Sequence, residues 1–140
     1  MNDYECILVA IDVYSDYVPV VQRAVNVSGS TQKIHLLYVT YPQTNFEPYG
    51  LFLERDYSND IQEQATKALR DIAHRHNIPS THVHVSIGSP AEEIHFMADK
   101  ISADLIVIGT HGQSGVKLLL GSTANAVLHG VKSDVLAVKV

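Results

Sequence analysis

Five short apolar runs, separated by stretches of helical periodicity, constrain the fold of this chain more than any other feature. Apolar runs this short are typical of strands that are buried on both faces, as in a parallel sheet. Parallel strands need crossover connections, which the intervening helices supply. We therefore expect an α/β fold, with one open, doubly wound, five-stranded parallel sheet and helices on both faces. The expected strands lie within residues 4–12, 33–40, 81–87, 105–108 and 135–140.

Local signals mark where the expected helices begin and end. Ser15-Asp16 can cap the first helix, and Gly29 can end it. Ser89 precedes Pro90, which is favoured at the first helical position. Ser89 also lies three residues before Glu92, so a capping box is available there.

Two strands are expected at the edges of the sheet. Residues 81–87 alternate polar and apolar side chains, which favours a less buried strand. If the strand at 135–140 lies at an exposed edge, it must either pair with another strand or be protected from unwanted pairing. Lys139 alone gives little such protection. The irregular segment 41–57 is long enough for a lid or a partner surface.

A glycine-rich stretch joins the fourth expected strand to the last helix. Gly-Thr-His-Gly occupies residues 109–112, an eight-residue loop follows, and Gly-Ser-Thr at 121–123 leads into a helix-like stretch at 124–129. Glycines let the backbone approach an anion closely, and the start of a helix favours phosphate. Either Ser122 or Thr123 could be the N-cap of that helix. The alternative is that the glycines only shape a surface loop before a capped helix.

Asp12 directly follows the first apolar run. Open α/β sheets bind ligands beyond the carboxyl ends of their strands, and Asp12 would lie there. Its carboxylate could accept hydrogen bonds from a ligand in that position. It could instead accept N–H groups of its own loop, as Asp side chains commonly do.

Composition limits the classes of function. The chain has 140 residues, enough for a single domain spanning 1–140. The formal net charge is −5 and no basic cluster stands out, so no nucleic acid partner is expected. No apolar run approaches the roughly 20 residues of a membrane span, and the polar N-terminus does not resemble a signal peptide. The single cysteine, Cys6, fits a reducing compartment, so we expect a cytoplasmic protein.

Eight histidines raise the question of a metal site. His82 and His84 would face the same side of a strand, but no third ligand occurs at a recognisable spacing, so we expect no metal. His111 lies inside the glycine turn and could contact a ligand. It has no oriented partner in the sequence and is assigned no catalytic role.

Taken together, these motifs resemble the universal stress protein family. The run 7–12 with its terminal Asp, Leu-Leu-Tyr-Val at 36–39, Gly-Ser-Pro-Ala-Glu-Glu-Ile at 88–94 and the two glycine motifs occur in the family's order along the whole chain. The resemblance implies a Rossmann-like, adenine nucleotide alpha hydrolase-like fold. In ATP-binding members the spacer between the glycine motifs is usually one residue longer than the eight residues present here.

The resemblance also implies a ligand and a partner. The ligand is ATP or AMP, with or without Mg²⁺, and the partner is a second copy that pairs through the last strand, 135–140. A further protein partner, of unknown identity, would respond to the bound state. The candidate nucleotide-binding residues, with His111 added from its place in the turn, are Ala10, Ile11, Asp12, Val39, Ile108, Gly109, His111, Gly112, Gly121, Ser122 and Thr123.

Three functions are compatible with this sequence. The first is a nucleotide-responsive regulatory or stress-tolerance module. The second is a slow ATPase or phosphotransferase, for which only Asp12 and His111 are available near the inferred pocket. The third is a dimeric adaptor that binds no nucleotide, which the short spacer keeps open. Binding is favoured over turnover. The chain lacks a Walker A motif, and it lacks Gly-x-Gly-x-x-Gly after the first strand.

Overall fold

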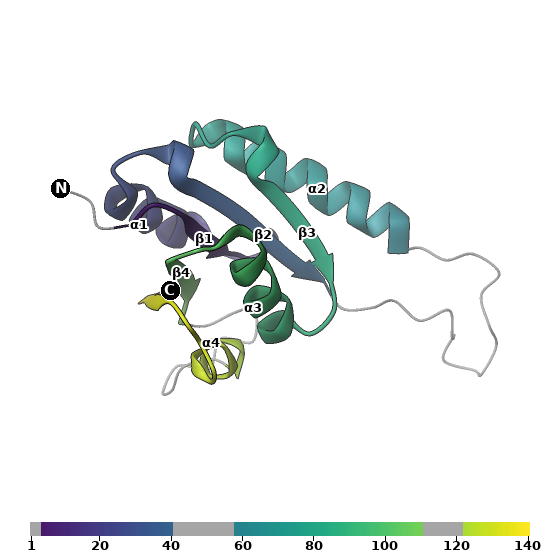
Figure 1. Cartoon of the computed structure of the whole chain (residues 1–140). Helices are drawn as coiled ribbons and strands as arrows, with labels where there is room; N and C mark the ends of the chain where they lie inside the picture. The colour runs from purple at the N-terminus through teal and green to yellow at the C-terminus, as the bar shows by residue number, and fades with distance from the viewer. Residues whose placement is uncertain (1–3, 41–57, 111–121) are drawn as a thin grey trace, which may run out of the picture.

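The computed structural model describes residues 4–40, 58–110 and 122–140, which form a three-layer α/β structure (Figure 1). Strands and helices alternate along these residues as the sequence predicts. The strands are β1 (Ile7–Ala10), β2 (Ile34–Thr40), β3 (Val83–Ile87), β4 (Leu105–Gly109) and β5 (Asp134–Val138). The helices are α1 (Val18–Ser28), α2 (Ser58–Arg75), α3 (Pro90–Ile101) and α4 (Ser122–Leu128). The short 3-10 turns η1 (Thr31–Lys33) and η2 (Ser80–His82) lead into β2 and β3.

The strands form one parallel sheet in the order β3-β2-β1-β4-β5. The chain builds outward from β1 to β2 and β3, then crosses back to the other side of β1 for β4 and β5. This topology confirms the predicted fold class. It also confirms the two predicted edges, and every residue of the edge strand β3 is partly exposed.

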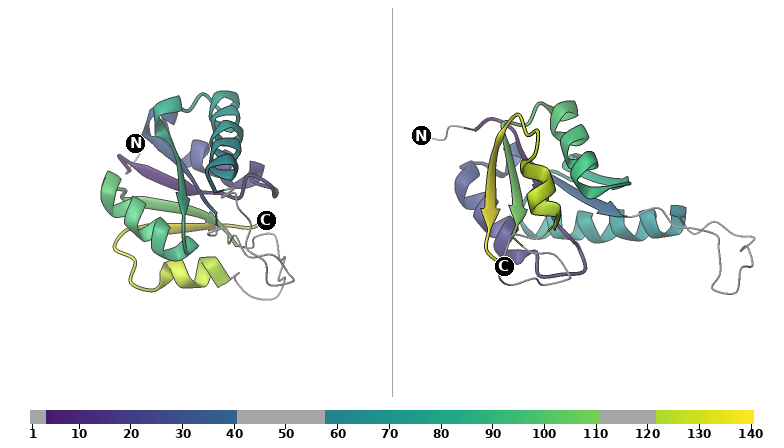
Figure 2. Two further views of the ribbon diagram at one scale, coloured as in Figure 1. Left: turned by 90° about the vertical axis from the view of Figure 1, so that its right-hand side faces the viewer. Right: turned by 90° about the horizontal axis from the view of Figure 1, so that it is seen from below.

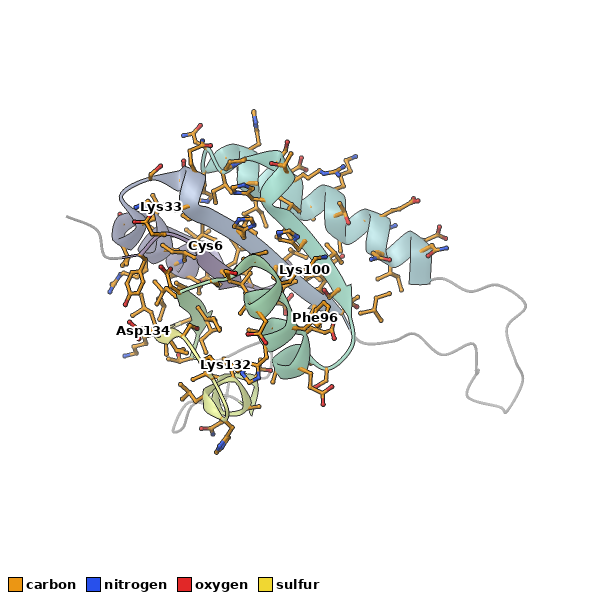
Figure 3. The ribbon with its side chains drawn as sticks, viewed as in Figure 1. Cys6, Lys33, Phe96, Lys100, Lys132 and Asp134 are labelled. Atoms are coloured by element: carbon orange, nitrogen blue, oxygen red, sulfur yellow. The ribbon has the colours of Figure 1, made fainter. Side chains whose placement is uncertain are left out.

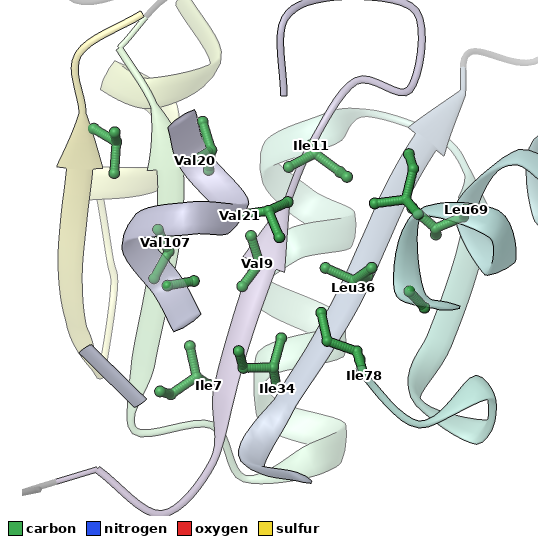
Figure 4. Close-up of a cluster of buried hydrophobic side chains, with 14 of the residues drawn as sticks. Ile7, Val9, Ile11, Val20, Val21, Ile34, Leu36, Leu69, Ile78 and Val107 are labelled. Atoms are coloured by element: carbon green, nitrogen blue, oxygen red, sulfur yellow. The ribbon is translucent and has the colours of Figure 1, made fainter. Parts of the chain in front are cut away.

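The central strands send alternate side chains into two apolar layers. Ile7 and Val9 of β1 pack with α1 and α2, whereas Leu8 between them packs with α3 and α4. Figure 2 shows these helices on the two faces of the sheet, and Figure 4 shows the first layer, with Val9 near Val21 of α1. Burial on both faces explains why these strands read as continuous apolar runs.

Asp104 fixes the start of β1 against β4. Its carboxylate accepts hydrogen bonds from the N–H groups of Glu5, at 2.8 Å, and Cys6, at 3.1 Å. Its own N–H donates to the Cys6 carbonyl oxygen at 2.9 Å. Because a carboxylate makes stronger hydrogen bonds than a neutral acceptor, this contact helps to set the register in which Ile7 lies opposite Leu105.

The predicted cap of α1 is wrong. The N-cap residue is Tyr17, which makes no side-chain cap hydrogen bond. Ser15 is used elsewhere, because its N–H and its hydroxyl both donate to the Asp12 carbonyl oxygen at 3.2 Å. The predicted end is confirmed, since Gly29 adopts φ 71°, a left-handed conformation that glycine takes without strain.

The starts of the last two helices also differ in part from the prediction. Ser89 is the N-cap of α3 and Pro90 follows it, as expected, but the Ser89 side chain makes no cap hydrogen bond and the capping box is not formed. The helix is instead entered through the backbone bond from Glu93 N–H to the Ser89 carbonyl, at 2.9 Å. Helix α4 begins at Ser122, so Ser122 and Thr123 lie in its first turn and not at the N-cap.

The two-faced core predicts a large difference between two leucines. Leu36 is fully buried, whereas Leu128 at the end of α4 is 44% exposed. Leu36→Ala should lower the free energy of unfolding by about 2–5 kcal/mol, because it leaves a cavity between the sheet and α2. Leu128→Ala, the matched control, should cost less than about 1 kcal/mol. Urea denaturation followed by circular dichroism measures both, and equal losses would contradict this description of the core.

Candidate functional site

The carboxyl ends of β1 and β4 meet where the sheet changes direction. β1 pairs with β2 on one side and with β4 on the other, and successive connections leave this point toward opposite edges. Connections that diverge in this way open a crevice beyond the strand ends, which is where open α/β sheets bind ligands. Asp12 follows β1 and Gly109 ends β4, so both lie at this edge of the sheet.

The strand residues of the predicted nucleotide site are brought to this region, but on two faces. Ala10, Val39 and Ile108 all pack in the apolar layer of α3 and α4. Ile11 belongs to the opposite layer, and its N–H donates to the Leu37 carbonyl oxygen at 3.0 Å. The amide of Ile11 is therefore already used by the sheet.

The glycine motifs are only partly covered by the structure. Gly109 is the last residue of β4 and lies opposite Val138 of β5. Ser122 and Thr123 open α4, and Thr123 is exposed. His111, Gly112 and Gly121 lie outside the described residues, as does the loop between the two motifs.

Asp12 holds its own turn together. One carboxylate oxygen, Oδ1, accepts a hydrogen bond from the Tyr14 N–H at 2.9 Å. The Asp12 carbonyl oxygen accepts the Ser15 N–H at 3.2 Å. This is the role as a loop acceptor that the sequence left open. A carboxylate has two oxygens with about four acceptor positions, so this bond leaves acceptor capacity for a ligand.

An aromatic pair beside Asp12 was not found by sequence reasoning. The rings of Tyr14 and Tyr38 meet edge to face, with centroids 5.9 Å apart and planes at 84°. Burial, then the charge of Asp12 and the nearby Tyr14, raise the pKa of the Tyr38 phenol, although a hydrogen bond with Thr40 opposes the shift. The phenol stays neutral near pH 7. The available signal was the position of Tyr14, two residues beyond Asp12.

Thr110 connects the first glycine motif to the last strand. Its N–H donates to the Val138 carbonyl oxygen at 2.8 Å, and its hydroxyl oxygen accepts the Val140 N–H at 3.3 Å. Sequence reasoning treated Thr110 only as a spacer between glycines. Its contacts tie the strand end that carries the candidate site to the C-terminal edge of the sheet.

We searched the described segments for a metal site, a reactive thiol and a membrane-spanning helix. No group of three His, Cys, Asp or Glu residues in residues 4–40, 58–110 and 122–140 is placed to hold a metal ion. Burial, and next the charge of Asp104, raise the pKa of the Cys6 thiol, which disfavours the reactive thiolate. None of the helices in these same segments is long and apolar enough to cross a membrane.

Sequence comparison assigns the chain to a family. The sheet topology, with its reversal beside β1, is that of the open α/β proteins. The family model of the Universal stress protein family matches residues 3–139. Universal stress protein A homolog 2 of Coxiella burnetii is 38% identical over 144 aligned residues, covering 100% of this chain and 98% of the relative. The chain belongs to the universal stress protein family.

Solved structures share the same fold. The hypothetical protein MJ0577 superposes with a TM-score of 0.75 at 23% identity, covering 98% of this chain and 96% of that one. A universal stress protein solved in complex with cAMP superposes with a TM-score of 0.64 at 22% identity, with 97% of each chain covered. At these identities the likeness establishes the architecture alone.

The contacts of Asp12 predict how its turn responds to substitution. Asp12→Ala should lower the free energy of unfolding by about 1 kcal/mol, because the Tyr14 N–H loses its acceptor. Asp12→Asn retains an oxygen at that position and should cost less than about 0.5 kcal/mol. Asp16→Ala, at an exposed neighbouring carboxylate, is the control. Urea denaturation measures all three, and similar losses for Ala and Asn at residue 12 would argue against the turn.

Proposed function

We propose that this chain is a cytoplasmic, homodimeric nucleotide-binding module that takes ATP or AMP, with or without Mg²⁺, at the carboxyl edge of its sheet. The observation that carries the proposal is the convergence of Asp12, Val39 and Gly109 from three adjacent strands at the point where the sheet reverses. A relative with the same fold solved in complex with cAMP adds support for an adenine nucleotide.

The proposed ligand contacts follow from the chemistry of each position. The free acceptor capacity of the Asp12 carboxylate suits ribose hydroxyls. Backbone groups of Ala10, Ile11, Val39 and Ile108 would surround the base, within the limit that the Ile11 N–H is already bonded. Main-chain specificity of this kind explains why apolar residues can occupy these positions.

Phosphate would be held by the two glycine motifs. Gly109, Gly112 and Gly121 permit close backbone approach, and Ser122 and Thr123 bring hydroxyl donors. His111 is a further donor for phosphate. Because α4 has only seven residues, we assign phosphate recognition to individual N–H and hydroxyl groups and give no weight to a helix dipole.

The proposal is binding and not turnover. Hydrolysis of ATP requires a group that orients the attacking water, as well as metal and charge stabilisation at the transferred phosphoryl group. Asp12 is the acid that follows the central strand β1, and one of its oxygens already accepts the Tyr14 N–H. A bound nucleotide would therefore act by changing contacts of the protein with its partners.

The second part of the proposal is the dimer. β5 lies at one edge of the sheet, paired in the described structure only with β4. An edge strand presents N–H and C=O groups that a second copy can satisfy. The exposed side chain of Ala137 is small enough for close approach.

Nucleotide binding is tested by calorimetric titration of the nucleotide-stripped protein with ATP and Mg²⁺. We expect a dissociation constant in the micromolar range, about −8 kcal/mol at 1 µM. Gly121→Asp should weaken binding by at least about tenfold, because a carboxylate would repel phosphate. Gly130→Asp introduces the same charge at a glycine where an added Cβ meets nothing within 4 Å. Because a side chain at φ +73° is strained, circular dichroism must first show that this control is folded, and it should then bind as the native chain does.

The outcomes of this titration separate the three functions. No heat and no thermal stabilisation of the native chain would exclude the nucleotide module and leave the adaptor. Equal weakening by both Asp variants would indicate a general charge effect without a phosphate site. Phosphate release during the titration, measured by ion chromatography, would favour the slow ATPase.

The dimer is tested by sedimentation equilibrium. The native chain should have twice its 15.4 kDa monomer mass. Ala137→Asp should shift it toward the monomer, because two like charges would meet across the paired edge. Ala126→Asp places the same change on an exposed position of α4 and should leave the dimer intact. A native monomer, or a dimer indifferent to Ala137→Asp, would refute pairing through β5.

A further inference from the structure

Three imidazoles gather at the β2–β3 edge of the sheet. His35 of β2 stacks on His82 of η2, with ring centroids 3.9 Å apart and planes at 10°. His35 Nδ1 lies 3.0 Å from His84 Nε2 of β3, in hydrogen-bond contact. The rings of His35 and His84 are also nearly parallel, with an interplanar angle of 14° and centroids 5.2 Å apart. This set, named here the histidine cluster, links two strands and the turn between α2 and β3.

The strand register explains why the cluster forms. β2 and β3 pair with Leu36 opposite Val83 and Leu37 opposite His84. His35 and His82 each precede one residue of the Leu36–Val83 pair, so the same register places His35 beside His82. Alternation along β2 and β3 then sends His35 and His84 to the face of Leu37, which is the face of α3 and α4.

The cluster is partly buried and faces a cation. Burial, followed by the proximity of His82 and His84, lowers the pKa of His35 to about 4. Burial, followed by Lys100 of α3 (Figure 3) and by His82, lowers the pKa of His84. Among the described residues, the charged groups that lower these two pKa values are His82 and His84 for His35, and Lys100 and His82 for His84. No carboxylate is among them to compensate an added positive charge.

Protonation is incompatible with the contacts as they stand. A single hydrogen between His35 Nδ1 and His84 Nε2 makes their bond, with one nitrogen donating and the other accepting. Once both rings are imidazolium, both nitrogens carry hydrogen and neither accepts. His82 Nδ1 lies 3.0 Å from the Ile34 carbonyl oxygen, which can only accept, so Nδ1 already carries hydrogen and an added proton goes to Nε2. Two stacked cations would then face each other across 3.9 Å.

We propose that the histidine cluster is an acid-sensitive contact that holds η2 and the edge strand β3 against β2 near neutral pH and releases them on acidification. β3 is the segment that yields because it has a sheet neighbour on one side only. The inference does not depend on nucleotide binding, since the cluster lies toward the amino-terminal half of β2, away from Val39.

The sign follows from proton linkage. Groups whose folded pKa lies below the unfolded value bind more protons when the contact is open. Their contribution to stability is present above the unfolded value of 6.5 and is lost as pH falls toward about 4. His76 on the turn after α2 also has a lowered pKa, caused by burial and then Arg75, so acid weakens the protein at a second place. The test therefore needs a local readout.

Hydrogen exchange with mass spectrometry supplies that readout. Peptides over β3 and over the central strand β4 are compared at about pH 7 and about pH 4.5, after correction for intrinsic exchange. In the native chain, protection of β3 should fall at least about tenfold more than protection of β4 on acidification. The comparison within one molecule separates local opening from global unfolding.

Two substitutions preserve the contact without its titration. In the double variant His35→Asn and His84→Gln, amide groups replace Nδ1 and Nε2 and can hydrogen-bond at any pH. It should retain β3 protection at about pH 4.5 to within about twofold of β4. His74→Gln, at an exposed position on α2, is the matched control and should behave as the native chain does. If circular dichroism shows the double variant unfolded, His84→Gln alone serves.

The result that supports the proposal is a selective acid loss of β3 protection that disappears in the double variant and persists in His74→Gln. Parallel losses in β3 and β4 of the native chain would overturn it. The same selective loss in the double variant would also overturn it, because the opening would then have another cause.

Discussion

Burial of β1 on both faces is the constraint on which the rest of the structure depends. Ile7, Leu8 and Val9 are each fully buried, although they point alternately to opposite sides. Each such side chain contributes about 1.5–3 kcal/mol only if the face to which it points is covered, so both faces need cover. The chain must therefore supply helices on two sides, and α1 with α2 cover one face while α3 with α4 cover the other. The change of side between α2 and α3 creates the reversal point at the end of β1, where the candidate site lies.

Polar contacts fix both ends of β1. Asp104 holds the start of β1 beside β4, and Asp12 closes the turn after β1 through the Tyr14 N–H. Just after β4, Thr110 forms hydrogen bonds with Val138, the last residue of β5, and with Val140 beyond it. The hydrogen bonds of Thr110 thus join the proposed nucleotide turn to the proposed dimer strand. A ligand that moved this turn would act directly on the edge that a second copy would pair with.

The histidine cluster shows how the same sheet can carry a second property at its other end. On the face of α3 and α4, Leu8 of β1 and Leu37 of β2 are buried in the apolar layer. Toward the β3 edge of the same face, His35 and His84 are only partly buried. Neutral imidazoles can pair there at moderate cost, because one donates and the other accepts. The arrangement is stable only while the rings are neutral, so its stability depends on pH.

The sequence by itself determined the order and type of the elements, since apolar runs, Gly29 and Pro90 act within a few residues of where they stand. The motifs at 7–12, 36–39 and 88–94, together with the glycine motifs at 109–112 and 121–123, predicted the family, and the family model confirms it. Local signals failed where a side chain had another partner, as at Ser15, or made no cap bond, as at Ser89. Only the tertiary structure decided that His35 would join His82 and His84, that Tyr38 would meet Tyr14, and that Asp104 would hold Cys6. These pairs are distant in sequence, and strand order and register, set by burial of the whole sheet, bring them together.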